Sequence, residues 1–128
     1  MKKNVASSTT LTKPLCGERQ AEMITLLIAD DHEVVRSGLR LQLEKQKDFD
    51  VVAEASEGRK AVSLARKHKP HVAILDVAMS DLNGVDATHQ IITSVPQVKV
   101  IALSALEDKG TVEMVLKAGA SGYALKKS

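Results

Sequence analysis

The sequence predicts a doubly wound α/β domain built on a five-stranded parallel sheet. Short apolar runs of strand length alternate along the chain with segments whose apolar residues recur at helical spacing. Such alternation requires crossover connections and places helices on both faces of a parallel sheet. The composition agrees, because a chain with one Tyr, one Phe and no Trp must build its core from aliphatic residues.

The first two strands and helices are predicted from apolar runs and helical spacing. Ile24–Ala29 is a continuous apolar run of strand length, and Val34–Lys45 places three apolar residues on one helical face, namely Val35, Leu39 and Leu43. Val51–Ala55 is the second strand. The following helix, Gly58–His68, has an inward stripe that consists of Ala61, Leu64, Ala65 and His68. Pro70 prevents this helix from continuing.

The third strand and helix repeat the pattern. Val72–Leu75 is a short apolar run, and Gly84–Val95 is a helix whose inward residues are Thr88, Ile91, Ile92 and Val95. Pro96 then stops the helix in the same way as Pro70 stops the one before it.

The last part of the chain contains a fourth helix between two strands. Val98–Leu103 is the fourth strand, and Asp108 is a suitable N-cap for a helix whose inward residues are Val112, Val115 and Leu116. Gly119 is expected to end that helix in a left-handed conformation. Gly122–Leu125 is a short fifth strand.

Composition limits the domain organisation and the cellular context. The 128 residues, 44% hydrophobic and 27% charged, suit one globular domain. Residues 1–22 lack periodicity and are rich in Ser, Thr and Lys, so we expect a disordered tail before a domain over 23–128. No apolar stretch approaches the roughly 18 residues of a membrane span, and no apolar segment follows Lys2 and Lys3 as in a signal peptide. A cytoplasmic protein with no membrane contact is predicted.

Five polar residues stand where the apolar runs end: Asp30, Asp31, Asp76, Ser104 and Lys126. The carboxyl ends of parallel strands meet at one edge of the sheet, where ligands of open α/β sheets usually bind. The sequence therefore predicts a chemical site at this edge.

The acidic members of this group predict a cation. Two carboxylates about 4 Å apart repel by roughly 4 kcal/mol at an effective dielectric constant near 20. A hard divalent ion removes that cost, and magnesium (Mg²⁺) suits a set of oxygen ligands beside a phosphate. In the alternative interpretation Asp30 and Asp31 only cap the next helix, since Asp is a favoured N-cap residue, and Asp76 only ends a strand. Ser104 and Lys126 favour the site, because a hydroxyl and an ammonium can bind phosphoryl oxygens.

These residues lie in segments that match a known family. IADDHEVVRSGL, LDVAMSDLNGVDA, VIALSA and GASGYALKKS follow one another in the order found in receiver domains of two-component response regulators. The stretch from about Met23 to Lys126 resembles those receivers, and most closely the subfamily that carries a LuxR-type helix-turn-helix. The resemblance implies a flavodoxin-like receiver fold and a role in phosphorelay signal transduction.

The resemblance also implies a role for each site residue. Asp76 corresponds to the phosphoacceptor and is one of the Mg²⁺ ligands, Asp31 binds Mg²⁺ directly, Asp30 acts through water, and the backbone carbonyl of Ala78 is a further ligand. Mg²⁺ is the implied cofactor.

Three further positions correspond to residues that sense the phosphoryl group. Ser104 would hydrogen-bond to it, Lys126 would form an ion pair with it, and Tyr123 would turn inward together with Ser104 on phosphorylation. Tyr123 also has a purely structural interpretation as an edge-strand aromatic, and His32 is expected to be a solvated residue of the first helical turn.

The chain departs from the family pattern in two places. Ser80 stands where most receivers have proline, which predicts a more flexible loop beside Asp76 and a different phosphorylation rate. Receivers also have a helix after the strand that precedes Lys126, whereas here only Lys127 and Ser128 follow. The last helix is therefore expected to be missing, and residues 23–128 are expected to form a truncated receiver of marginal stability.

The implied partner is a sensor histidine kinase, and a second copy of the chain is a further candidate. The parent of such a receiver would bind DNA, but this chain has no segment for direct DNA binding. A Mg²⁺-dependent phosphatase is the competing enzyme class, but haloacid-dehalogenase-like phosphatases have a second Asp two residues after the nucleophile as general acid, and here that position is Ala78. A nucleotide-binding switch is not favoured, because neither GxxxxGK[ST] nor GxGxxG occurs. A phosphoacceptor rather than an enzyme is predicted, with a non-phosphorylated interaction module or a non-functional fragment as alternatives.

Overall fold

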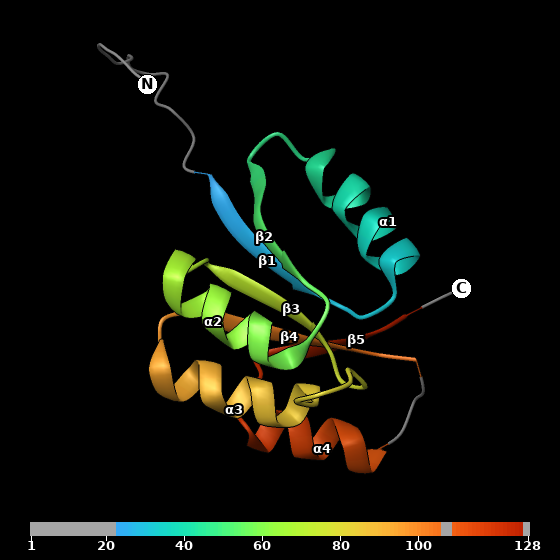
Figure 1. The fold of residues 1–128 in the computed structure, drawn as a ribbon, viewed down its shortest axis with the longest axis vertical. Coiled ribbons are helices and arrows are strands. Elements are labelled where there is room, and N and C mark those ends of the chain that lie inside the picture. The colour runs from blue at the N-terminus through green and yellow to red at the C-terminus, as the bar shows by residue number, and fades with distance from the viewer. Residues whose placement is uncertain (1–22, 106–108, 127–128) are drawn as a thin grey trace.

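A computed structural model describes residues 23–105 and 109–126 (Figure 1). The expected tail over 1–22 and the expected N-cap Asp108 lie outside the described residues. In chain order the elements are β1 (Ile24–Ala29), α1 (Glu33–Glu44), β2 (Phe49–Ala55), α2 (Gly58–His68), β3 (Val72–Asp76), α3 (Gly84–Ser94), β4 (Lys99–Ser104), α4 (Lys109–Lys117) and β5 (Gly122–Leu125).

The five strands form one parallel sheet in the order β2-β1-β3-β4-β5. This is the flavodoxin-like order, in which the direction of winding reverses between β1 and β3. Ala29 of β1 lies beside Leu75 of β3, so the residues that follow them, Asp30 and Asp76, leave the sheet at the same level. The predicted fold class is confirmed, and the topological switch point lies where the acidic residues gather.

Helices α2, α3 and α4 cover one face of the sheet, and α1 lies on the other (Figure 1). The larger core packs beneath α2 and α3 and includes Leu27, Ala61, Ile91 and Val98, all fully buried. Among the described residues, no helix is long and apolar enough to cross a membrane.

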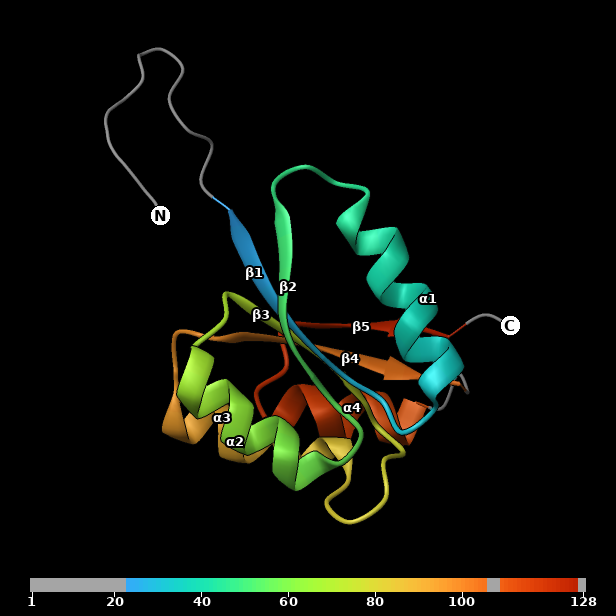
Figure 2. The same ribbon diagram turned by 45° about the horizontal axis from the view of Figure 1, so that its top comes forward.

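The face under α1 is less completely covered. Figure 2 shows α1 lying apart from the other three helices. Val35, Leu39 and Leu43 face the sheet as predicted, but they are only half-buried, and no residue of α1 is fully buried. A groove of about 580 Å³ runs between α1 and the ends of β4 and β5, with Leu103 and Leu125 among its lining residues.

Two predicted inward residues face solvent instead. His68 belongs to the last turn of α2 and is exposed, whereas Val62 is buried. Leu116 of α4 is exposed because its neighbour Val115 points into the core, and a helix turns by about 100° per residue. The strand β2 begins earlier than predicted, at Phe49, because Ile24 of β1 pairs with that residue.

Close backbone contacts fix the loops at the carboxyl edge. A Cβ atom on Gly58, the first residue of α2, would lie 1.8 Å from the carbonyl oxygen of Leu82. A Cβ atom on Gly84, the first residue of α3, would lie 2.5 Å from the carbonyl oxygen of Asp76. Gly119 has φ = +117° and follows α4, as the sequence predicts. Because Gly58 and Gly84 have no Cβ atom, the loop after Asp76 can pack closely against both α2 and β3.

Two helical glycines make a matched pair for testing these contacts. Gly58→Ala should lower the free energy of unfolding by about 1–3 kcal/mol, because the new methyl group meets backbone that cannot move away. Gly38→Ala should raise it by about 1 kcal/mol, because Gly38 lies inside α1 with no atom within 4 Å of the added Cβ. Urea unfolding measures both. Equal effects of the two substitutions would contradict the close packing of α2 on the loop.

Candidate functional site

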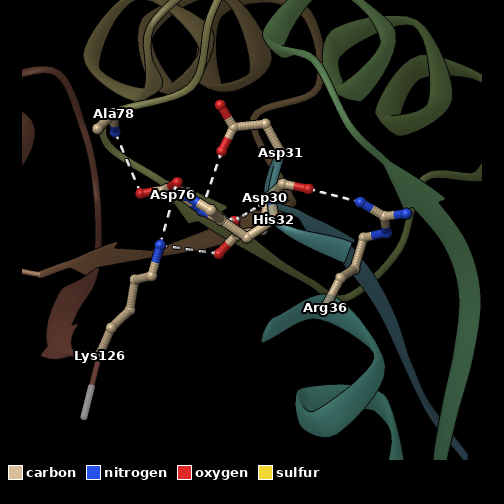
Figure 3. Close-up of polar contacts among 7 residues, drawn as sticks. All are labelled: Asp30, Asp31, His32, Arg36, Asp76, Ala78 and Lys126. Atoms are coloured by element: carbon tan, nitrogen blue, oxygen red, sulfur yellow. Dashed lines mark hydrogen bonds and ion pairs between the residues drawn. The ribbon is translucent and has the colours of Figure 1, made fainter. Parts of the chain in front are cut away.

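The strand-end residues lie together at the carboxyl edge of the sheet, as predicted, and Figure 3 shows four of them: Asp30, Asp31, Asp76 and Lys126. Asp30 follows β1, Asp76 ends β3, Ser104 ends β4 and Lys126 follows β5. The side chains of Asp30 and Asp76 are 0% and 1% exposed, so both carboxylates are inside the protein. A pocket of about 230 Å³ opens above Asp76, and Ser104 and Lys126 are among the residues that line it.

Lys126 joins the two buried carboxylates. Its Nζ lies 3.1 Å from Asp30 Oδ2 and 3.3 Å from Asp76 Oδ2 (Figure 3). Burial alone would lower the pKa of Lys126, but its contacts with Asp30 and Asp76 outweigh burial and raise that pKa above the ordinary value. The ammonium therefore stays charged and partly neutralises the site.

Asp76 remains a costly buried charge in spite of this partner. Its Oδ1 accepts a hydrogen bond of 3.1 Å from the backbone N–H of Ala78. Burial raises the pKa of Asp76, and the charge of Asp30 raises it further, whereas the N–H of Ala78 and the ammonium of Lys126 lower it. The net pKa shift is upward, so the ionised carboxylate is less stable here than in water.

Asp30 has one oxygen that the protein does not fully satisfy. Oδ1 accepts a hydrogen bond of 2.8 Å from the backbone N–H of His32. Oδ2 is buried and makes no well-aligned hydrogen bond among the described residues, although the ammonium of Lys126 lies 3.1 Å from it. A buried, unsatisfied carboxylate oxygen is costly, and a bound cation would remove that cost.

The donor atoms fit a divalent cation. Asp30, Asp31, His32 and Asp76 each offer one ligand atom, and these four atoms lie within 4.8 Å of one another. Three of the groups are carboxylates, the donors that Mg²⁺ prefers. The backbone of Ala78 lines the same pocket, and its carbonyl remains a predicted ligand.

The capping alternative describes only part of this arrangement. The N-cap of α1 is His32, and its side chain makes no capping hydrogen bond. Asp30 accepts the N–H of His32 but holds Lys126 at the same time, while Asp31 lies beside the ring of His32. Helix capping therefore does not account for the acidic group.

His32 is solvent-exposed at the start of α1, as predicted, but it also has contacts that the prediction did not include. Its ring is 64% exposed, yet Nδ1 lies 3.1 Å from Asp30 Oδ1 and 3.1 Å from Asp31 Oδ1. It also lines the pocket above Asp76. Its place directly after two acidic residues and before a helix is the signal in the sequence that could have indicated this contact.

Two further residues that the sequence did not indicate hold the Asp30 turn in place. Arg36 of α1 donates from Nη1 to the backbone carbonyl of Asp30 at 2.7 Å (Figure 3). It also donates from Nε to Glu54 of β2 at 3.0 Å. Glu54 also pairs with Arg40 one turn later in α1, and this contact raises the pKa of Arg40. The ion pairs tie α1 to β2 and fix the backbone that presents the acidic residues.

The structure gives the positions of the predicted switch residues Ser104 and Tyr123, and their movement on phosphorylation stays a prediction. Ser104 is buried at the end of β4, and its carbonyl accepts the N–H of Lys126 at 2.8 Å. Tyr123 lies half-buried in β5 opposite Ala102 and does not line the pocket. Thr111 of α4, which the sequence did not indicate, does line it. The pocket is thus lined by a residue of α4, the helix that precedes β5 and Tyr123 in the sequence.

The loop beside Asp76 is held by an ion pair. Asp81 has a left-handed conformation with φ = +73°, which is uncommon for a residue other than glycine. Its Oδ1 lies 3.0 Å from Nε of Arg59 in α2. The neighbour of Ser80, Met79, is buried in the core. These contacts attach the loop to α2 and to the core. The more flexible loop and the different phosphorylation rate predicted from Ser80 both stay predictions.

Comparison with known proteins now identifies the family. The model of the response regulator receiver domain matches residues 26–128. The chain belongs to the response regulator receiver family. It is 44% identical over 103 residues to the transcriptional regulatory protein DegU of Brevibacillus brevis, a match covering 80% of this chain and 44% of that protein. The chain thus spans about half the length of the curated relatives it matches.

Solved receiver structures agree in fold. The receiver domain of the response regulator NarL from Mycobacterium tuberculosis superposes with a TM-score of 0.80 at 31% identity, covering 84% of this chain and 87% of that one. A LuxR-family response regulator from Aurantimonas sp. SI85-9A1 gives a TM-score of 0.79 at 28% identity, covering 84% and 76%. The predicted function as a two-component receiver and its similarity to LuxR-type regulators are confirmed.

The raised pKa of Asp76 predicts the effect of removing its charge. A raised acidic pKa means that stability falls as the pH rises from the ordinary value of 3.8 through the pKa of the folded state, so the full penalty is present at neutral pH. Asp76→Asn should therefore raise the free energy of unfolding at neutral pH by about 0.5–2 kcal/mol. Below the ordinary pKa the gain should vanish.

Urea unfolding with and without Mg²⁺ measures this effect. Mg²⁺ should stabilise the wild type more than the variant, because a ligand of the native state adds stability in proportion to its affinity. Asp50→Asn, at an exposed position of β2, is the matched control. A lower stability of Asp76→Asn at neutral pH would contradict the cost assigned to the buried charge.

Proposed function

We propose that Asp76 accepts a phosphoryl group from a phosphohistidine of a sensor kinase and holds it in the pocket above β3. The observation that supports this most directly is the environment of the Asp76 carboxylate. It is 1% exposed, lies 3.3 Å from the ammonium of Lys126, and lines a pocket to which Ser104 and Thr111 also contribute. A carboxylate in such a site can act as a nucleophile towards phosphorus.

The transfer uses one oxygen of Asp76. Oδ1 is held by the N–H of Ala78, and Oδ2 faces Lys126. Oδ2 forms the new bond to phosphorus while the bond from phosphorus to the imidazole nitrogen of the kinase breaks. The imidazole leaves with that electron pair and takes a proton from solvent. The product is an acyl phosphate on Asp76.

Lys126 and Ser104 then bind the phosphoryl oxygens. The ammonium of Lys126 is already within 3.3 Å of the acceptor oxygen, so a short movement brings it to the new dianion. Charge-assisted hydrogen bonds of this kind are roughly twice as strong as neutral ones. The hydroxyl of Ser104 lines the same pocket and supplies a neutral hydrogen bond.

The acidic residues are assigned to Mg²⁺. Asp31, Asp76 and the carbonyl of Ala78 would hold the ion directly, and Asp30 would act through water. When bound, Mg²⁺ supplies positive charge that offsets the crowding of the carboxylates and of the incoming phosphate. The crowding of these carboxylates supports the assignment, since Asp30, Asp31 and Asp76 each offer a ligand atom within 4.8 Å of the others.

Phosphorylation is expected to change the surface formed by α4 and β5. Ser104 connects the pocket to β4, Thr111 connects it to α4, and Tyr123 lies in the adjoining strand β5. New bonds at Ser104 would bias these elements between two arrangements. In this scheme the chain is a phosphoacceptor rather than a turnover enzyme, and any DNA binding belongs to a longer parent protein.

Intact mass spectrometry tests the proposed function. The full chain is incubated with acetyl phosphate and Mg²⁺, and one hydroxylamine-labile phosphoryl adduct per molecule is expected. Asp76→Asn should abolish the adduct, whereas Asp50→Asn, at an exposed position of β2, should retain it. Chelation of Mg²⁺ should also abolish it.

Two results would overturn the proposal. Folded wild type without an adduct would favour an interaction module that is never phosphorylated. An adduct that persists in Asp76→Asn would place the acceptor elsewhere. An unfolding curve on the same sample establishes that the protein is folded.

A further inference from the structure

His32 is the nitrogen donor among the four ligand groups at the carboxyl edge. Its Nδ1 lies 3.1 Å from one oxygen of Asp30 and 3.1 Å from one oxygen of Asp31. In Figure 3 the ring lies next to both carboxylates, and His32 is among the residues that line the pocket above Asp76. Since most of the ring is open to solvent, an ion can reach Nδ1 without any rearrangement of the core.

The spacing of these atoms is that of ligands on a single ion. Ligands bound at about 2.0–2.2 Å lie roughly 3.0–3.5 Å apart in octahedral or tetrahedral geometry. The distances from Nδ1 of His32 to the two carboxylate oxygens fall in this range. The fourth donor of the group, a carboxylate oxygen of Asp76, lies within 4.8 Å of the other three ligand atoms, so the same ion could reach it as well.

Backbone contacts hold His32 in this position. Its N–H donates to Asp30 Oδ1 at 2.8 Å, and its carbonyl accepts the N–H of Arg36 at 3.0 Å. The residue begins α1, so the direction of its side chain is set by the helix and by the Asp30 turn. Only the side-chain torsions remain free, and the ring therefore needs little reordering to bind an ion.

An imidazole changes which ions a carboxylate site prefers. Mg²⁺ favours oxygen ligands, whereas Mn²⁺, Co²⁺ and Zn²⁺ gain affinity from an imidazole nitrogen. We propose that His32 is a metal-selectivity residue that binds divalent transition ions through Nδ1, together with the carboxylates of Asp30 and Asp31, in preference to Mg²⁺. This inference rests on the proposed function, because it assigns a further ligand to the same cation site.

The expected consequence is competition at the site. A transition ion held by His32 shares Asp30 and Asp31 with Mg²⁺, so the two ions cannot bind at once. The receiver would thereby respond to the ratio of Mg²⁺ to transition ions around it.

Isothermal titration calorimetry of the full chain with MgCl₂ and with CoCl₂ tests the inference. The variants are His32→Ala and the matched control His89→Ala, which removes an exposed histidine of α3 away from the site. His32→Ala should weaken Co²⁺ binding by about tenfold or more. It should weaken Mg²⁺ binding by much less, and His89→Ala should leave the ratio of the two affinities unchanged. A merely structural role of His32 would lower both affinities together.

A spectroscopic measurement identifies the bond itself. Electron spin echo envelope modulation of the Mn²⁺-loaded wild type should contain the coupling of a directly bound imidazole nitrogen, and His32→Ala should lose it. Equal losses of Co²⁺ and Mg²⁺ affinity, or no nitrogen coupling in the wild type, would overturn the inference.

The two proposals can fail separately. Metal selectivity is measured without a phosphodonor, so its result does not depend on whether Asp76 can be phosphorylated. A phosphoryl adduct formed with Mg²⁺, combined with no loss of Co²⁺ selectivity in His32→Ala, would refute the role of His32 alone.

Discussion

The repulsion between buried carboxylates at the junction of β1 and β3 is the constraint on which the site depends. The parallel register brings Asp30 and Asp76 out of the sheet at the same level, and both are almost fully buried. Water cannot screen them there, so the protein has to supply the compensating groups. Lys126, reaching from the end of β5, is the positive charge that the fold itself provides.

One ammonium does not remove the whole cost. The pKa of Asp76 stays raised, and Oδ2 of Asp30 lacks a well-aligned hydrogen bond. The fold thus retains an energetic demand for positive charge at its carboxyl edge, which a divalent cation would meet. In the proposed function a phosphoryl group adds negative charge to the same place, and Lys126 would then follow that charge. On that proposal, a destabilising feature of the resting protein is the source of its response.

The sequence predicted the fold and the convergence of the site well, for a physical reason. Parallel strands share a carboxyl edge, so polar residues at the ends of apolar runs must meet once the alternation of strands and helices is recognised. Asp30, Asp76, Ser104 and Lys126 follow this rule. The place of His32 directly after two acidic residues could have indicated its contact with them. The bond from Arg36 to the carbonyl of Asp30 could not be predicted, since it depends on side-chain torsions and on how α1 packs against β2. Leu116 was assigned inward because helical spacing alone does not distinguish adjacent positions of a short helix.

Carbon-detected NMR of protein labelled at the aspartate carboxyl carbons tests the central claim most directly. Titrated without divalent cation, Asp76 should lose its proton at a pH above the ordinary range for aspartate, because burial and Asp30 raise its pKa. With saturating Mg²⁺ its midpoint should move to lower pH, since the cation favours the ionised form. If Asp76 titrates in the ordinary range and Mg²⁺ leaves its midpoint unchanged, the site carries no unmet charge and the account is wrong.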